Sequence, residues 1–517
     1  MKKLILLLCF VSFLTKAQNI TVASGKSFTV EKTGSVTMSG NFSNSGAFTL
    51  NSDSDEFSSI IIGGSVTGNI TYNRYVNSVG TNEWDLIGAP VEGQSISAFA
   101  SANVSTLATN GATKAIGYYN NADNTWTNYT TSTIGGAGNF PLGKGFQMAT
   151  IANGTGILSF TGAPTATNQT WTIIDNDAAN SGAGTRWNLV ANPFPSYIYG
   201  NANADSSHNF LTVNSDKLND SYEAIYGYDA DGSGYTVYNN TSAALRLAPG
   251  QAFMVASDNA ENDTISFTTA MRTTTGGDDL IVGRDPIDSF ELVLKLYEGD
   301  SEIDHTKFYF GDGLGLDLDP GYDAGHFNQG ASLMSRLVEE DEGVGLVINA
   351  MGLESVNDVV APLELNMEAG NNFRISIGTF NINIGTNVYL EDNVQETMTL
   401  LNDQDFELTA ENELSGVGRF FIHLTETVLS IDDKIETNYL NVFKADVNNF
   451  ITVEGLANQS NGTKLRLYTI LGKEVIFTTL NNTNNKQTIS TQGLSSGIYI
   501  VKLESGNILL TKKLFIK

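Results

Sequence analysis

The sequence contains a single cysteine, Cys9, which lies in an apolar segment at the start of the chain. Once that segment is removed, the chain can form neither a disulfide nor a metal site built on thiolates. The composition therefore excludes cysteine-based zinc sites and thiol catalysis.

Positive charge is also scarce. Lysine and arginine number 28 against 56 aspartates and glutamates, so the formal net charge is -28 at pH 7. Nucleic acids and anionic membrane surfaces are polyanions, and binding them requires clustered basic side chains. We therefore expect no nucleic-acid partner, and the charge fits an exported protein or one that meets divalent cations.

Long apolar runs are missing, apart from the one between residues 4 and 14. This run follows two lysines and is too short to cross a bilayer, which needs about 20 apolar residues. The pattern is typical of a secretory signal peptide over residues 1–17, with cleavage after Ala17. No second run could span a membrane, so we expect no transmembrane segment in the mature chain.

Catalytic motifs are sparse. No two histidines have the spacing of helical metal ligands, and no H-E-x-x-H is present. A phosphate-loop pattern over 138–145 has glycine where serine or threonine would bind magnesium, and a G-x-S-x-G over 493–497 precedes a strand pattern. The chain is therefore more consistent with a non-catalytic protein, although a glycosidase needs only two carboxylates.

Glycine is abundant, with 51 residues, and short apolar alternations lie between turn residues. This composition predicts an all-β fold of tandem β-sandwich-like modules. In residues 18–75, apolar pairs recur every eight to twelve residues. That spacing fits either a short β-solenoid-like stack or an antiparallel meander, and both leave an edge that the next unit must cover.

An internal duplication follows. Four motifs occur twice in the same order, separated by 103 to 109 residues, as loop insertions between repeats would produce. The matched segments are 84–90 with 187–193, 115–119 with 224–228, 141–146 with 248–253, and 158–161 with 265–268. We predict two homologous β-modules, 76–170 and 171–275.

Each module contains a predicted hairpin, over 119–126 and 228–235, in which aromatic residues flank turn residues. Trp84 and Trp187 occupy equivalent places in apolar strands, so we expect both to be core residues. Trp126 is the tryptophan expected to be exposed, where it could stack on a sugar ring.

Residues 276–428 form a more acidic segment with alternating strands, which predicts a further β-sandwich. Its loop over 311–323 carries Asp317, Asp319 and Asp323. Calcium takes six to eight oxygen ligands, and these carboxylates could supply some of them. The loop can be interpreted as a structural calcium site or as a solvated acidic loop, and the solvated loop is the favoured interpretation.

The C-terminal part combines short strands with glycine turns. Leu-Gly-Lys-Glu-Val, Leu-x-x-Gly-Ile-Tyr and Lys-Lys-Leu-Phe-Ile-Lys occur in that order, and the last ends the sequence. This pattern resembles the C-terminal sorting domain, type A, of cargo proteins of the type IX secretion system of Bacteroidota. The residues that carry the resemblance are Leu471, Gly472, Val475, Leu494, Gly497, Tyr499, Lys512, Lys513 and Lys517.

The resemblance implies an Ig-like sorting domain over 429–517, with the type IX secretion machinery as partner. It also implies an extracellular or outer-surface location. Many family members enter the first strand through Tyr-Pro-Asn-Pro, whereas this chain has Asn-Val-Phe-Lys-Ala-Asp over 441–446, which leaves the start of that strand open.

These observations rank three functions. A non-catalytic secreted or surface protein of adhesin or matrix type comes first, with surface polysaccharide or other cells as partners. A carbohydrate-binding protein comes second and a polysaccharide hydrolase third. Apart from structural calcium, no cofactor is predicted.

Overall fold

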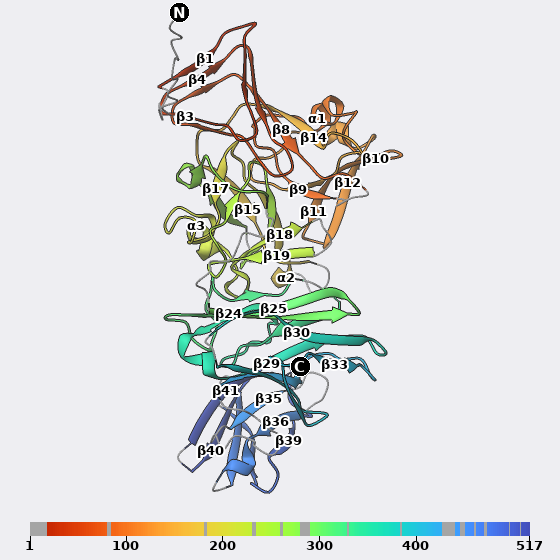
Figure 1. Cartoon of the computed structure of the whole chain (residues 1–517), viewed down its shortest axis with the longest axis vertical. Coiled ribbons are helices and arrows are strands. Elements are labelled where there is room, and N and C mark those ends of the chain that lie inside the picture. Colours follow the sequence, from red (N-terminus) through yellow and green to blue (C-terminus); the bar gives the residue numbers. More distant parts are fainter. Residues whose placement is uncertain are drawn as a thin grey trace, which may run out of the picture.

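A computed structural model describes residues 18–79, 84–179, 184–229, 234–258, 262–279, 290–327, 330–382, 385–426, 440–444, 450–459, 462–469, 473–495, 497–506 and 508–516. Strands make up 51% of the structure and helices 8%, which confirms the all-β prediction. The β-units are stacked along the long axis, with the N-terminal strands at one end and the sorting domain at the other (Figure 1). The predicted signal peptide, 1–17, lies outside the described residues.

The first strands form a β-solenoid with three faces, because each strand pairs in parallel with the equivalent strand of the next turn. Of the two alternatives predicted for residues 18–75, the solenoid-like stack is the one that forms, and the antiparallel meander is excluded. Phe28 stacks on Phe48 at 5.0 Å between ring centroids, and it covers Phe48, which is 2% exposed. The faces are β1 (Ile20–Val22), β4 (Phe42–Asn44) and β7 (Val66–Thr67); β2 (Ser27–Val30), β5 (Ala47–Asn51) and β8 (Ile70–Tyr75); and β3 (Ser35–Met38) with β6 (Ser59–Ile62).

The solenoid is joined directly to the unit that follows. Strand β8 pairs antiparallel with β14 (Ile157–Gly162), so β14 covers the edge that the solenoid would otherwise expose. The solenoid and the first module share one hydrophobic core, which includes Tyr72, Phe99 and Phe160. Trp84 is partly buried against the same core.

The duplicated motifs form two sheets with the same strand order and register. In the first sheet Phe146 pairs with Ile87, and in the second Phe253 pairs with Val190. The order is β12 (Thr125–Thr130), β11 (Thr113–Asn120), β13 (Phe146–Met148) and β9 (Asp85–Ile87) in one sheet, and β19 (Gly234–Tyr238), β18 (Ile225–Asp229), β21 (Ala252–Ala256) and β16 (Trp187–Ala191) in the other. The matching register supports the duplication, while the module boundaries stay a prediction.

An asparagine at the C-terminal end of a helix is also duplicated. Asn103 follows helix α1 (Ile96–Ala102), and its amide donates to Ser159 O at 3.1 Å while its Oδ1 accepts from Ser159 N at 2.8 Å. Asn214, at the end of α3 (Phe210–Asn214), makes the same pair of bonds to Ser266, at 3.0 and 2.7 Å. Each asparagine thus ties a helix to the strand beneath it.

Short elements complete the two modules. They are β10 (Thr109–Asn110), η1 (Ile134–Gly136), β15 (Gln169–Ile173), α2 (Asn176–Ala179), β17 (Tyr197–Tyr199), η2 (Ser215–Lys217), η3 (Asp220–Tyr222), β20 (Arg246–Leu247), β22 (Asp263–Phe267), η4 (Thr269–Met271) and β23 (Arg272–Thr273). Strand β15 pairs with β22 as β8 pairs with β14, so each module has an equivalent strand pair, although β8 and β14 extend the solenoid sheet while β15 and β22 form a sheet of two strands.

The acidic segment forms one continuous 11-stranded sheet rather than two separate ones. Its two halves meet where Ser335 of β27 pairs with Leu346 of β28, and they enclose a single core. The elements are β24 (Phe290–Glu298), β25 (Ser301–Gly311), β26 (Ala324–Gly325), β27 (Ser332–Ser335), β28 (Leu346–Gly352), η5 (Leu353–Asn357), β29 (Asp358–Asn366), β30 (Asn372–Asn381), β31 (Asn387–Asp392), β32 (Thr397–Leu400), β33 (Phe406–Thr409) and β34 (Val417–Thr425).

The second module and the acidic domain meet in an aromatic cluster. Trp187 packs edge-on against Phe327 at 4.4 Å and against Tyr226 at 4.6 Å between ring centroids. Tyr235 lies 4.1 Å from Phe327, and the hydroxyl of Tyr226 donates to Gly325 O at 2.8 Å. Trp187 is therefore partly buried between domains, not inside the core of its own module.

The sorting domain is a sandwich of two sheets. One holds β35 (Asn441–Lys444), β36 (Phe450–Glu454) and β39 (Lys486–Ser490); the other holds β38 (Glu474–Leu480), β37 (Thr463–Thr469), β40 (Gly497–Ser505) and β41 (Ile508–Ile516), and η6 (Leu456–Asn458) follows β36. A separate core lies between the sheets. Within the described ranges, no helix is both long and apolar enough to cross a membrane.

Candidate functional site

The sorting-domain residues named from the sequence lie mostly on or beside β38, β40 and β41. Val475 and Leu494 pack against the domain core. Tyr499 is 6% exposed, and its hydroxyl donates to Ser495 O at 2.9 Å. Gly497 begins β40, while Lys512 and Lys513 lie on β41 opposite Val501 and Ile500. Leu471, Gly472 and Lys517 lie outside the described residues.

Strand β35 connects the sorting domain to the acidic domain. Leu440, Val442 and Phe443 are each 5% exposed or less, and Leu440 and Val442 belong to the sorting-domain core. The ring of Phe443 also lies 5.2 Å from that of Phe421 on β34. The segment that replaces Tyr-Pro-Asn-Pro is thus a true first strand that contacts both domains.

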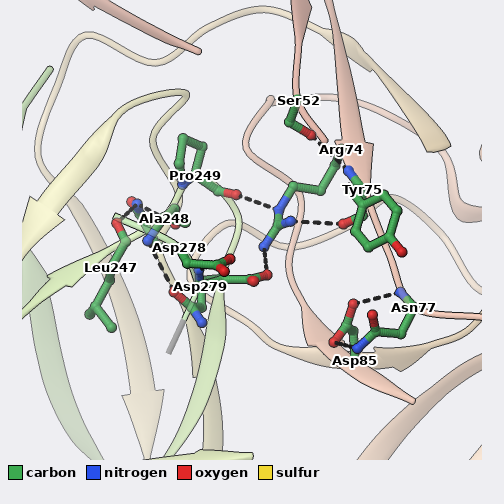
Figure 2. A network of polar contacts seen from close by, with 12 residues as sticks. Ser52, Arg74, Tyr75, Asn77, Asp85, Leu247, Ala248, Pro249, Asp278 and Asp279 are labelled. Carbon is green, nitrogen blue, oxygen red and sulfur yellow. Dashed lines mark hydrogen bonds and ion pairs between the residues drawn. The ribbon is translucent and has the colours of Figure 1, made fainter. Parts of the chain in front are cut away.

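A buried arginine joins the solenoid to the second module (Figure 2). Arg74 is completely buried, and its Nε donates to Pro249 O at 3.0 Å. Its Nη1 donates to Tyr75 O at 2.7 Å, and its Nη2 pairs with Asp279 Oδ2 at 2.6 Å. The guanidinium also lies 4.1 Å from the ring centroid of Phe57. All three guanidinium nitrogens therefore have partners, and two of them, Nε and Nη2, join strand β8 to distant segments.

Two neighbouring carboxyls take part in this junction. Burial, together with the adjacent charge of Asp279, raises the pKa of Asp278 to about 7. Arg74 balances Asp279 but forms no ion pair with Asp278. The junction therefore holds one paired carboxylate and one carboxyl that is partly protonated near neutral pH.

Trp126 lies on the predicted hairpin and is 37% exposed. Its ring packs on Tyr119 at 5.2 Å between centroids. The equivalent pair in the second module, Tyr228 and Tyr235, has a similar spacing of 5.3 Å, but there Tyr235 is covered by Phe327 of the acidic domain. The duplication thus leaves the Tyr119–Trp126 pair accessible, while the Tyr228–Tyr235 pair is partly buried against the acidic domain.

Lys144, from the discounted phosphate-loop pattern, lies among aromatic rings. Its Nζ is 5.1 Å from the ring centroid of Tyr118, 5.5 Å from Phe146 and 5.9 Å from Trp171. Burial lowers the pKa of this ammonium. Trp171 belongs to the second module, so the contact is a cation–π junction between modules.

The predicted calcium ligands do not converge on one point. Asp323 is completely buried, with Oδ1 accepting from Ala350 N and Oδ2 from Asp319 N, both at 2.7 Å. Asp319 Oδ2 accepts from Gly315 N at 2.8 Å. Asp323 thus anchors the loop, so the interpretation as a solvated loop is wrong for this residue. Calcium binding by Asp317, Asp319 and Asp323 stays a prediction.

No group of three or more histidine, cysteine, aspartate or glutamate side chains is placed to hold a metal ion in the parts that the structure describes. Each of the four histidines lies within 3.7 Å of a carboxylate, and two of these contacts are short. His326 Nε2 lies 2.8 Å from Asp304 Oδ2, and His423 Nε2 lies 2.8 Å from Glu391 Oε2. His326 and Asp304 are buried, so the pair joins the β26 region to β25.

Glu223 gives a test of how pH affects the junction between the second module and the acidic domain. It is 7% exposed, and burial, followed by the charge of Asp220, raises its pKa to about 7. Between pH 4.5 and about 7, the folded protein keeps the Glu223 proton, whereas the unfolded chain, with a pKa near 4.5, has lost it. The free energy of unfolding should therefore fall as pH rises from the unfolded pKa to the folded pKa. Above about pH 7 the buried carboxyl is ionised, and the whole loss of stability is present.

We expect Glu223→Gln to stabilise the protein at pH 8 by roughly 2 to 3 kcal/mol and to have little effect at pH 5. Melting temperatures at both pH values measure this difference. Glu92→Gln, at an exposed glutamate, is the control and should leave the melting temperature unchanged at both pH values. Equal melting temperatures for wild type and Glu223→Gln at pH 8 would contradict the assignment.

Comparison with known proteins agrees with this architecture. The model described as "Secretion system C-terminal sorting domain" matches residues 445–517, so the chain is an all-β protein exported by type IX secretion to the cell surface or extracellular space. The model described as "Domain of unknown function (DUF8693)" matches residues 10–423, and the chain belongs to that family.

No curated protein matches the chain. Among solved structures, one titled "Biofilm associated protein - BSP domain" is 8% identical, with 87% of this chain and 96% of that chain covered and a TM-score of 0.16. At that TM-score the likeness supports no conclusion about fold or function.

Proposed function

We propose that this chain is a non-catalytic surface or secreted protein of adhesin or matrix type, exported by the type IX secretion machinery of a member of the Bacteroidota. The observation that carries the proposal is the arrangement of its ends. The sorting domain lies at one end of an elongated stack and the solenoid at the other (Figure 1). Such a stack holds its N-terminal units away from the export signal.

The junctions between units support this role. The solenoid shares its core with the first module, Arg74 joins the solenoid to the second module, and Trp187 packs against the acidic domain. Buried side chains at each junction resist bending, because separating the units would expose apolar surface and unpaired polar groups. A stiff stack transmits load and keeps a distal surface at a fixed distance.

Carbohydrate binding is the alternative that a specific observation favours. The accessible Tyr119–Trp126 pair presents aromatic faces, and the equivalent Tyr228–Tyr235 pair packs against Phe327 of the acidic domain, which supports a binding role for the exposed pair. Sugar rings stack on faces of this kind through their apolar C–H groups. Under this alternative, surface polysaccharide is the partner and β12 carries the site.

Beads coated with the chain from Gln18 onward test both functions. We expect coated beads to bind cells or each other more than beads coated with heat-unfolded protein. If polysaccharide is the ligand, soluble polysaccharide should block binding and Trp126→Ala should weaken it about 10-fold, equivalent to ~1.4 kcal/mol. Phe477→Ala, at an exposed aromatic residue of the sorting domain, is the matched control. Equal binding by folded and unfolded coats would contradict the adhesin proposal.

A further inference from the structure

A polar side-chain contact links the first and last strands of the sorting domain. Strand β35 lies at the edge of one sheet and β41 at the edge of the other, and β41 packs against β35. Lys512 Nζ, from β41, lies 3.5 Å from Asn441 Oδ1, from β35. The described strands of the two sheets share no ladder of backbone hydrogen bonds, so this contact bridges an open side of the sandwich.

The lysine has the properties of a nucleophile. Burial lowers the pKa of Lys512, which increases the fraction of neutral amine at a given pH. Glu339 and Asp341 of the acidic domain face it and oppose that shift, while Arg336 adds to it. A desolvated lysine amine is a group that proteins use to attack carbonyl carbons.

The asparagine is placed as the electrophile. Asn441 is 6% exposed, and its Oδ1 accepts a hydrogen bond from Val442 N at 2.8 Å. A backbone N–H aimed at this oxygen polarises the amide and stabilises the negative charge that develops when a nucleophile adds. The two reacting groups are also held at close range by the fold, which lowers the entropic part of the barrier.

We propose that Lys512 and Asn441 join in an intramolecular isopeptide bond. Lys512 Nζ attacks Asn441 Cγ, the bond from Cγ to the amide nitrogen breaks, and a new Cγ–Nζ bond forms. One proton passes from the attacking amine to the departing amide nitrogen, which leaves as ammonia, so no oxidant or other reactant is needed. The nearby charges of Asp341 and Glu339 favour the positive charge that develops on Nζ during the attack, and Asp341 is itself held by Arg336, at 3.0 Å between Oδ2 and Nη2.

Two consequences follow from where these groups lie. The bond ties the first strand to the last, so the sandwich cannot open along that side. The carboxylates belong to the acidic domain, so the bond forms after the sorting domain has docked on that domain. Formation of the bond in the sorting domain therefore requires that the acidic domain has already folded.

Intact-mass spectrometry tests the proposal. We expect the chain, produced with a methionine before Gln18 to prevent cyclisation of the N-terminal glutamine, to weigh one ammonia, about 17 Da, less than its sequence mass. Lys512→Met and Asn441→Ala should each restore the full mass, and Lys473→Met, at an exposed lysine, should keep the deficit.

Proteolytic mapping gives a second readout that does not depend on the variants. A branched peptide that contains both Asn441 and Lys512 is the expected product, and it separates the isopeptide bond from ammonia loss at an Asn-Gly sequence. Full mass in the wild-type chain, both after purification and after prolonged incubation at neutral pH, overturns the proposal. A deficit that persists in Lys512→Met also overturns it.

Discussion

A chain that lacks residues 440–517 should accumulate in the periplasm and be absent from the cell surface and the medium. The predicted signal peptide supplies only the first crossing, of the inner membrane, whereas the sorting domain directs export by type IX secretion. Fractionation of cells that carry the shortened chain, followed by immunoblotting of each fraction, measures the outcome. Normal amounts of the shortened chain outside the cell would refute the assignment.

A graft sharpens this prediction. A periplasmic reporter fused to residues 429–517 should be exported, whereas fusion to 445–517, the segment that the sorting-domain model matches, should be exported poorly. The shorter graft lacks β35, and with it Leu440, Val442 and Phe443. Burying such side chains stabilises a fold by about 1.5 to 3 kcal/mol each, so their loss is large for a domain of this size. Equal export of both grafts would show that β35 is dispensable.

The sequence predicted the features that depend on local pattern. Both hairpins form as expected, with Tyr119 opposite Trp126 and Tyr228 opposite Tyr235, because turn residues between aromatic strands specify a hairpin locally. The duplicated motifs, which occur in the same order, also predicted that the two modules share strand order and register. In the solenoid, strand spacing was visible, but spacing alone does not say whether neighbours run parallel or antiparallel.

Features that depend on distant contacts could not be predicted. Arg74 meets Pro249 and Asp279, which lie 175 and 205 positions away in the chain. Trp187 was expected in its own core, yet it faces Phe327 of the acidic domain. Both outcomes depend on how the modules dock, and neither composition nor periodicity specifies docking. One signal was available: a phenylalanine four positions before an asparagine occurs in both modules, and those asparagines bond the end of a helix to the strand beneath it.

Arg74→Met should cost the protein about 3 to 5 kcal/mol, the second large effect that we expect, because it removes one partner of a buried ion pair. Methionine fills part of the volume but donates no hydrogen bond. It therefore leaves Pro249 O and Tyr75 O without their donors and Asp279 without its cation. Arg74→Lys keeps the charge but cannot present three donors in a fork, so it should lie between wild type and methionine.

Denaturant unfolding of the full chain measures this cost, with the unfolding transition of the N-terminal units as the monitored signal. Arg246→Met is the matched control, since Arg246 lies 5.9 Å from the ring of Tyr199 and forms no ion pair with a carboxylate among the described residues. The control should cost no more than about 1 kcal/mol. Because Arg74 and Asp279 act as a pair, the double variant Arg74→Met/Asp279→Asn should lose less than the two single costs added together. Strictly additive costs would mean that the guanidinium stabilises the junction through its backbone contacts and Phe57 alone, and would contradict the ion pair as its main contribution.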